Sequence, residues 1–322
     1  MKWLPTDKWG KLRSFTEVMC LAALLIHLSM NGGIWNAIRE APSKLKMIMY
    51  TFVLPPADFR TDFFGLVYEG RSGNILDDLI LVYGAQEKPE LFLLRDVALA
   101  MGTRDLVFYD LGANVGQHTL FMSKYAKRID AFEPYPPVLK RLRNNVAINQ
   151  LATVHIHAVG LGDENGSIPY FEPLDYNLGG GGFVHNPENG DRPIEKLSLV
   201  IGDDYAKKQK LPDPDLVKID IEGYEKPAIL GFSQTLGRSR PVILVEITPG
   251  YPTSFRDVMD LLANLPPDYA IAALCEADQQ TGSYRLCPYE SDKFWTHGPA
   301  NLILYPKERA SILPFSGRAA AQ

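Results

Sequence analysis

Short continuous apolar runs alternate along the chain with longer stretches in which apolar residues recur at helical spacing. The runs lie at Val107–Leu111, Ile129–Phe132, Thr153–Val159, Leu216–Ile221 and Pro241–Ile247. Runs of this length are typical of strands that are buried on both faces of a parallel sheet. Strands that alternate with helical stretches predict an α/β fold, in which helices cover both faces of the sheet.

The stretches between and after these runs predict the helices and the last strands. Helices are expected at Val115–Tyr125, Pro134–Asn149, Pro227–Leu236 and Thr253–Leu265. The final strands are expected at Tyr269–Cys275 and Asn301–Tyr305, with a hairpin-like turn at Thr281-Gly282 between them. Antiparallel strands at these positions would complete a mixed sheet of seven strands.

The first 60 residues have a different pattern. Val18–Met30 is apolar and 13 residues long, whereas a membrane-spanning helix needs ~20 residues. Three alternatives remain for it: a packed amphipathic helix, a helix anchored at a membrane surface, and a cleaved signal peptide. A second helix is expected over Ile34–Tyr50, and Leu54-Pro55-Pro56 indicates a boundary. Residues 1–60 are therefore predicted to form a helical extension, with membrane association through residues 18–30 left open.

Residues 61–102 are predicted to lead into the main domain. Strand-like or apolar runs around glycines occur at Phe63–Gly70 and Asn74–Tyr83. Pro89–Met101 has helical spacing, with a proline at its start and a glycine just after its end. The main domain is expected over residues 103–308, and a tail over residues 309–322.

A tight turn follows the strand Val107–Leu111, and its glycines let a ligand approach the backbone closely. The predicted contacts in this turn are Gly112, Ala113, Asn114 and Gly116. Asp110, just before the first glycine, can accept hydrogen bonds from a ligand's ammonium group. Glu133 lies 21 residues after Gly112, where doubly wound folds place the acid that binds two ribose hydroxyls.

The turn also discriminates between nucleotides. A dinucleotide fold requires G-x-G-x-x-G, but Asn114 stands where the middle glycine would be. Asp110 would repel a phosphate, whereas it suits a cationic amino-acid group. The combination predicts S-adenosylmethionine as the cofactor.

Four segments of the chain resemble the FkbM family of methyltransferases. They are V-F-Y-D-L-G-A-N-V-G-Q-H-T-L from Val107, A-F-E-P-Y-P from Ala131, A-V-G-L-G-D-E-N-G from Ala158 and L-V-K-I-D-I-E-G-Y-E from Leu216. The resemblance covers roughly residues 104–306, and K-I-D-I-E-G-Y-E is its most specific part. It implies a class I, Rossmann-like fold that uses S-adenosylmethionine, and usually O-methylation of a hydroxyl on a sugar, glycan or secondary metabolite.

Two alternatives from other classes were weighed against this one. A nucleotide-dependent oxidoreductase or epimerase is disfavoured by the incomplete glycine motif. An inactive, methyltransferase-like binding module is disfavoured by the presence of the acids and glycines that the cofactor needs.

The candidate catalytic residues follow from strand ends, because ligands of open parallel sheets bind outside the carboxyl ends of the strands. They are Asp220, Glu222, Glu246 and His118. A carboxylate or an imidazole can remove the proton of an acceptor hydroxyl, and histidine titrates near neutral pH. Three acids could instead hold Mg²⁺, although no diagnostic metal spacing is present. Lys218 is expected to pair with one of these acids.

Two further positions are tied to the cofactor or the acceptor. The resemblance implies that Asp163, in the turn after the third strand, contacts the adenine amino group; turn chemistry explains this residue equally well. The glycine run Gly179–Gly182 is interpreted either as a lid over the acceptor pocket or as a disordered excursion. His185, at its edge, could contact substrate, and a plain surface position is the alternative.

Composition narrows the partners and the compartment. The net charge of −5 argues against general nucleic-acid binding, which leaves a small molecule or a glycan as the expected acceptor. Cys20, Cys275 and Cys287 are odd in number and lack C-x-x-C spacing, so neither a zinc site nor a disulfide framework is predicted. A cytoplasmic location is therefore expected, with possible attachment to a membrane.

Overall fold

The computed structural model describes residues 42–185, 189–289 and 300–315. The apolar segment Val18–Met30 and most of the helix predicted over Ile34–Tyr50 lie outside these ranges. The end of that predicted helix is described as α3 (Ser43–Ile48) and one π-helical turn (Met49–Val53). None of the helices within these ranges is long and apolar enough to cross a membrane.

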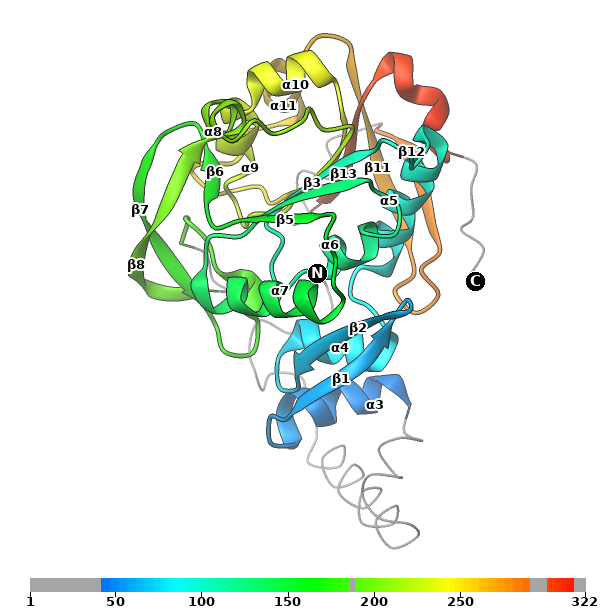
Figure 1. Ribbon diagram of the computed structural model, residues 1–322, viewed down its shortest axis with the longest axis vertical. Coiled ribbons are helices and arrows are strands. Elements are labelled where there is room, and N and C mark those ends of the chain that lie inside the picture. Colours follow the sequence, from blue (N-terminus) through cyan, green and yellow to red (C-terminus); the bar gives the residue numbers. More distant parts are fainter. Residues whose placement is uncertain (1–41, 186–188, 290–299, 316–322) are drawn as a thin grey trace, which may run out of the picture.

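The main sheet has eight strands with mixed directions (Figure 1). Their order across the sheet is β5 (Val154–His157), β4 (Arg128–Phe132), β3 (Val107–Leu111), β9 (Leu216–Ile219), β10 (Val242–Ile247), β13 (Ala300–Pro306), β11 (Tyr269–Ala277) and β12 (Tyr284–Pro288). The strands from β5 to β10 pair in parallel. β13 is antiparallel to both of its neighbours, and β12 is antiparallel to β11. The predicted class I architecture is confirmed, with β12 added at the edge beyond the seven expected strands.

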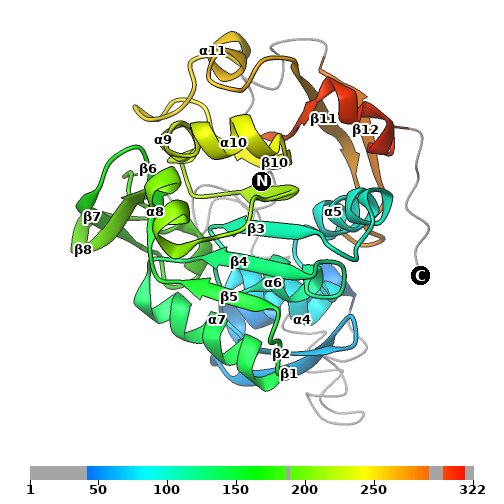
Figure 2. The ribbon, with the colours of Figure 1, turned by 45° about the horizontal axis from the view of Figure 1, so that its top comes forward.

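Alternate residues along each strand face opposite layers of helices. Phe108 belongs to the core under one layer, whereas its neighbour Tyr109 belongs to the core under the other. The first layer consists of α5 (Lys88–Met101), α6 (Gln117–Met122) and α7 (Pro136–Ile148). The second consists of α8 (Gly202–Gln209), α9 (Glu225–Gly231), α10 (Ser233–Ser239) and α11 (Val258–Ala263). Figure 2 shows the two layers on either side of β3, β4 and β5.

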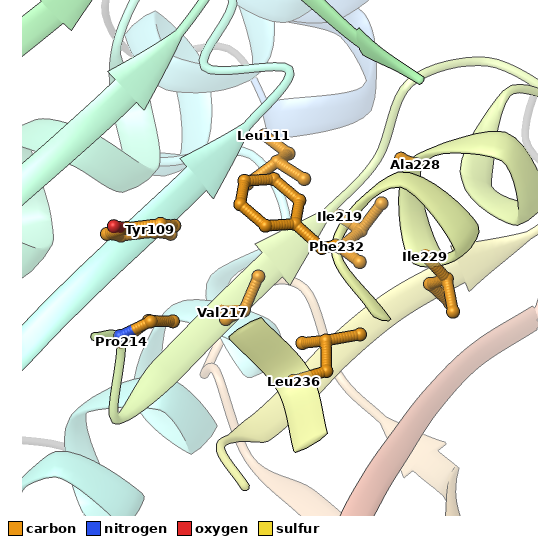
Figure 3. A pocket seen from close by; sticks show the side chains of 9 residues that line it. All are labelled: Tyr109, Leu111, Pro214, Val217, Ile219, Ala228, Ile229, Phe232 and Leu236. Atoms are coloured by element: carbon orange, nitrogen blue, oxygen red, sulfur yellow. The ribbon is translucent and has the colours of Figure 1, made fainter. Parts of the chain in front are cut away.

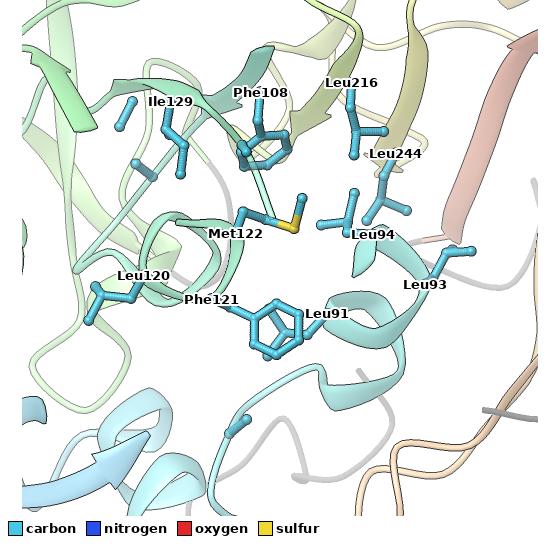
Figure 4. Close-up of a cluster of buried hydrophobic side chains, with 14 of the residues drawn as sticks. Leu91, Leu93, Leu94, Phe108, Leu120, Phe121, Met122, Ile129, Leu216 and Leu244 are labelled. Carbon is cyan, nitrogen blue, oxygen red and sulfur yellow. The ribbon is translucent and has the colours of Figure 1, made fainter. Parts of the chain in front are cut away.

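Dense apolar packing fixes these helices on the sheet. In the first layer Leu94 and Met122 lie next to Phe108, while Leu120 lies on the other side of α6 (Figure 4). All four side chains are at most 1% exposed. Burying a side chain of this size stabilises the fold by about 1.5–3 kcal/mol, so the sheet and its helices form one cooperative core.

The lead-in region forms a hairpin and a helix that pack against α7. β1 (Asp58–Phe63) pairs with β2 (Leu66–Arg71), and α4 (Ile75–Tyr83) follows where the sequence showed only a strand-like or apolar run. Asn74 caps α4 by accepting a hydrogen bond from the backbone N–H of Leu76, which explains the helix. The buried carboxylate of Asp77 accepts two hydrogen bonds from Arg141 in α7, both at 2.7 Å. This ion pair joins the lead-in region to the main domain.

A second sheet of three strands lies beside the main one. It contains β6 (Gly160–Gly162), β7 (Gly166–Pro173) and β8 (Asn189–Ile201), with β8 in the middle. The apolar pattern at Ser167–Glu172 predicts a short strand, which is β7, whereas no strand was expected where β8 lies. Close packing of α9 on β6 also explains why the helix predicted over Pro227–Leu236 is two helices. A Cβ added at Gly231 would lie 1.8 Å from the carbonyl oxygen of Gly162, and α10 begins just after this contact.

The edge hairpin of β11 and β12 carries a disulfide between Cys275 and Cys287, with a Cα–Cα distance of 5.9 Å. The prediction of no disulfide is therefore wrong. The spacing of the cysteines gave no signal, because only the hairpin register brings these two strand positions together. Disulfides are typical of oxidising compartments, so the cysteines no longer support the expected cytoplasmic location. Cys20 lies outside the described residues.

Candidate active site

The turn between β3 and α6 is shaped by two glycines in the left-handed region. Gly112 has φ +77°, and a Cβ there would lie 1.9 Å from the backbone oxygen of Asp220. Gly116 has φ +98°, and a Cβ there would lie 2.6 Å from Leu142. The glycines therefore also permit close packing inside the protein, in addition to the ligand approach expected from the sequence.

Glu133 follows β4 and holds this turn in place. Its Oε2 accepts a hydrogen bond from the backbone N–H of Asn114 at 3.0 Å, and its Oε1 accepts one from Tyr135 at 2.8 Å. Burial raises the pKa of Glu133 to about 7, although these two hydrogen bonds oppose the shift. Each carboxylate oxygen has a second lone pair, so both oxygens can still accept a ligand hydroxyl.

Asp110 lies fully buried near the carboxyl end of β3. Its Oδ2 accepts a hydrogen bond from the Thr119 hydroxyl at 2.6 Å, while its Oδ1 has no hydrogen-bond partner among the described residues. A buried carboxylate oxygen without a partner is costly, and a ligand's ammonium group would satisfy it. Asp110 and Glu133 thus fit a ligand that carries an ammonium group and two hydroxyls, as S-adenosylmethionine does.

Lys218 and Asp220 form an ion pair where β9 ends. Lys218 Nζ lies 3.0 Å from Asp220 Oδ2 and 3.3 Å from the backbone oxygen of Gly112. Burial lowers the pKa of Lys218, but the carboxylates of Asp220, Asp110 and Glu87 outweigh burial and raise it. The ammonium is therefore charged, and the pairing expected for Lys218 is present. The side chain of Asp220 is 24% exposed, so an acceptor can reach it.

Two further acids face Asp220. One carboxylate oxygen each of Glu87, Asp220 and Glu246 lies within 4.8 Å of the other two. Burial, followed by Asp220 and other acids, raises the pKa of Glu87 to about 8 and that of Glu246 well above its usual range. We call these three residues the acid cluster.

The sequence placed Glu222 in this group, but the structure places Glu87 there instead. Glu222 has φ +55° and lies next to Gly182, whose added Cβ would be 3.3 Å from Cβ of Glu222. Glu225, which sequence reasoning missed, is buried and folds the loop back. Its Oε1 accepts hydrogen bonds from the backbone N–H groups of Ile221 and Gly223. No local pattern marks Glu87, because it is 133 residues from Asp220 along the chain.

His118 in α6 is buried against the acid cluster. Its Nε2 lies 3.9 Å from Oε2 of Glu87 and has no hydrogen-bond partner among the described residues. Burial lowers the pKa of His118 well below its usual range, and the Lys218 ammonium lowers it further. The ring is therefore neutral, contrary to the near-neutral titration expected from the sequence.

The remaining candidates lie on the small sheet or its connections. Asp163 follows β6 and is exposed. It does not belong to the acid cluster. His185 is exposed and packs its ring against Phe171 at 5.3 Å between centroids. In the glycine run, Gly182 pairs with Phe171 of β7 through two backbone hydrogen bonds, and a Cβ on Gly179 would lie 3.3 Å from Asn114 Nδ2. The run thus pairs with β7 and lies beside the cofactor turn.

A separate cavity of about 10 Å³ lies under α9 and α10, away from these residues (Figure 3). Its lining includes Leu111, Val217 and Phe232, and the hydroxyl of Tyr109 donates to the Pro212 carbonyl. A space of this size holds at most about one water molecule. It is a packing gap in the core and not a binding site.

Comparison with known proteins gives the family. A family model for the methyltransferase FkbM domain matches residues 110–269. The hexuronic acid methyltransferase AglP of Haloferax volcanii is 30% identical over 190 residues, which are 56% of this chain and 75% of AglP. The 2-O-methyltransferase NoeI of Sinorhizobium fredii is 26% identical over 163 residues, which are 45% of this chain and 65% of NoeI.

A solved structure of an FkbM methyltransferase from Methylobacillus flagellatus KT is also similar, with a TM-score of 0.41 and 18% identity. The similarity covers 62% of this chain and 44% of that chain. This chain therefore spans less than two thirds of NoeI and of that solved chain. The family model includes the cofactor turn, Glu133 and the Lys218–Asp220 pair, and the match to AglP extends over three quarters of that enzyme. The chain belongs to the FkbM family and is an S-adenosylmethionine-dependent methyltransferase of class I.

Proposed function

We propose that this enzyme methylates a hydroxyl group of a sugar or glycan. One relative is named a hexuronic acid methyltransferase, and another is named a 2-O-methyltransferase. Membership of this methyltransferase family also excludes the oxidoreductase or epimerase alternative. The carrying observation is the partly exposed carboxylate of Asp220, which is held by Lys218 directly beside the cofactor turn.

The residues around the turn have distinct roles in this proposal. S-adenosylmethionine, when bound, supplies an activated methyl group. Glu133 accepts hydrogen bonds from the two ribose hydroxyls, and the free oxygen of Asp110 accepts from the ammonium group. Both carboxylates are buried and already oriented by protein donors, so binding requires little rearrangement.

Asp220 acts on the acceptor. A sugar hydroxyl is a poor nucleophile until its proton is removed, and a positioned base contributes ~10²–10⁴ to the rate. Asp220 accepts that proton at its carboxylate, which the ion pair with Lys218 holds beside the cofactor turn. His118 is buried, and its lowered pKa makes the imidazole a weak base, so Asp220 is the base in this proposal.

The acceptor lies between the acid cluster and the glycine run in this proposal. Gly179 packs toward Asn114 of the cofactor turn, and Gly182 packs toward Glu222 in the loop after β9. Glycines leave room for a bulky sugar ring and expose backbone groups that can bind hydroxyls.

The direct test is methyl transfer from labelled S-adenosylmethionine to a panel of sugars. The panel should contain a hexuronate, the matching neutral hexose, and versions of each that lack single hydroxyls. Labelled product with the intact sugar and none with one deoxy version would identify the methylated position. Tight cofactor binding with no product from any hydroxyl compound would instead favour the inactive binding module.

A further inference from the structure

The acid cluster carries more negative charge than its surroundings balance. Three carboxylates approach within 4.8 Å, and in the described part of the chain one ammonium, that of Lys218, forms an ion pair with them. Two negative charges therefore remain when all three are ionised. Buried like charges at this distance must either take up protons or bind a cation.

His118 supplies a second and independent observation. Its imidazole is 6% exposed, and Nε2 has no hydrogen-bond partner in the described residues. Nε2 faces Oε2 of Glu87 at 3.9 Å, a separation too long for a hydrogen bond. The other oxygen of Glu87 accepts from the amide of Gln86 at 3.3 Å. A buried nitrogen without a hydrogen-bond partner thus faces a carboxylate oxygen of the partly exposed Glu87.

These separations match those between ligands of one metal ion. Ligand atoms at ~2.1 Å from an octahedral metal lie ~3.0–4.2 Å from one another. The 3.9 Å between His118 and Glu87 falls inside this range, and the 4.8 Å limit for the carboxylates lies just above it.

We propose that Glu87, His118, Asp220 and Glu246 bind one divalent cation. Three carboxylates and one imidazole form a ligand set that suits Mn²⁺, with Mg²⁺ as the oxygen-preferring alternative. The two unbalanced negative charges equal the charge of such an ion. The site itself is independent of the acceptor. Its role rests on the proposed function: the cation would bind the acceptor hydroxyl oxygen and lower its pKa, so that Asp220 can take the proton more easily.

The four ligands are presented by separate elements of the fold. Glu87 stands before α5, His118 lies in α6, Asp220 follows β9 and Glu246 lies in β10. The amide oxygen of Gln117 accepts from the backbone N–H of Gln86 at 2.6 Å, which ties the Glu87 loop to α6. The site is therefore assembled before any ion binds.

The test is a titration of the full-length protein, treated with EDTA and dialysed, with Mn²⁺. Electron paramagnetic resonance measures the free aqueous ion, so no acceptor or methyl transfer is needed. We expect one tightly bound Mn²⁺ per chain. Glu87→Gln and Glu246→Gln should each weaken binding by about tenfold or more, because each removes a charged ligand. Asp213→Asn, which alters an exposed carboxylate paired with Arg238, should bind as the wild type does.

Thermal unfolding of the same samples provides the second readout. Mn²⁺ should raise the melting temperature of the wild type and leave that of the Glu87→Gln/Glu246→Gln double variant unchanged. Without metal, the double variant should be at least as stable as the wild type, because repulsion between the acids is removed. Wild-type protein that binds no Mn²⁺ or Mg²⁺, or a folded double variant that binds Mn²⁺ normally, would overturn the site. A sugar panel without product would refute the proposed function and leave this titration intact.

Discussion

Glu133 after β4 and Glu246 in β10 are both largely buried carboxylates at the same edge of the sheet, but their surroundings differ in kind. The carboxylate of Glu133 accepts two hydrogen bonds from backbone N–H groups. Glu246 instead faces the carboxylates of Glu87 and Asp220. Backbone donors cannot change their charge or position easily, so they fix the orientation of the Glu133 carboxylate in the cofactor half of the site. The three carboxylates of the acid half repel one another unless a proton or a cation balances their charge. A reaction that moves a proton can therefore take place there.

The two halves meet at Gly112, so Gly112→Ala should have the largest effect. A Cβ there would overlap the backbone oxygen of Asp220 at 1.9 Å, and φ is +77°. Overpacking and left-handed backbone strain together should lower the free energy of unfolding by about 2–4 kcal/mol. Chemical denaturation measures this loss. Gly65→Ala is the matched control, because Gly65 has φ +84° and nothing within 4 Å of an added Cβ. Equal losses in the two variants would show that the close approach does not matter.

Asp220→Asn tests whether the two halves function separately, because it removes a charge from the acid half only. Turnover should fall by ~10²-fold or more, because the base is lost, while the affinity for S-adenosylmethionine changes little. Single-turnover kinetics and calorimetry on one preparation measure both quantities. If Asp220 only balances the charge of Lys218, the melting temperature should fall and the turnover of the folded protein should be spared.

Glu133→Gln perturbs the other half. The amide would point a donor at a backbone N–H group, so cofactor affinity should fall by about 1–3 kcal/mol. In the wild type, the pKa of about 7 adds a pH dependence. Glu133 must lose its proton to accept two hydroxyls, so affinity should be full above pH 7 and fall about tenfold from pH 8 to pH 6. Calorimetry across this range should show the slope in the wild type and a flat profile in Glu133→Gln. A flat wild-type profile would remove Glu133 from the ribose site.

The smallest effect is expected from Gln279→Ala in the disulfide-closed edge hairpin. The side chain of Gln279 accepts from the backbone N–H of Lys88 and donates to the Ala85 carbonyl, so it braces the loop that presents Glu87. Loss of about 1 kcal/mol here should reduce turnover roughly fivefold and leave cofactor affinity unchanged. Gln280→Ala is the control, because the exposed Gln280 contacts Lys88 through its backbone oxygen. If Gln279→Ala lowered cofactor affinity as much as it lowered turnover, the two halves of the site would not be separate.

Much of the cofactor half could be predicted from the sequence because its determinants are local. The strand at Val107–Leu111, the turn through Gly116 and the acid at Glu133 lie within 27 residues, and each pattern has one physical explanation. Apolar runs of strand length also predicted the parallel core and its helices. The roles of Asp163 and Glu222 were harder to predict, because turn residues and strand-end acids have several explanations.

The sequence indicated Asp220, Glu246 and His118, but tertiary structure alone brought Glu87 into the acid half. Glu87 joins Asp220 and Glu246 only because α5, β9 and β10 meet at one edge of the sheet. The Cys275–Cys287 bond and the edge strand β12 likewise depend on hairpin register, which spacing along the chain does not specify. Local patterns determine which segments become strands and helices, since hydrophobic periodicity acts over a few residues. Contacts between residues more than a hundred positions apart arise only from packing of the whole fold, and the charges of this site are set by those contacts.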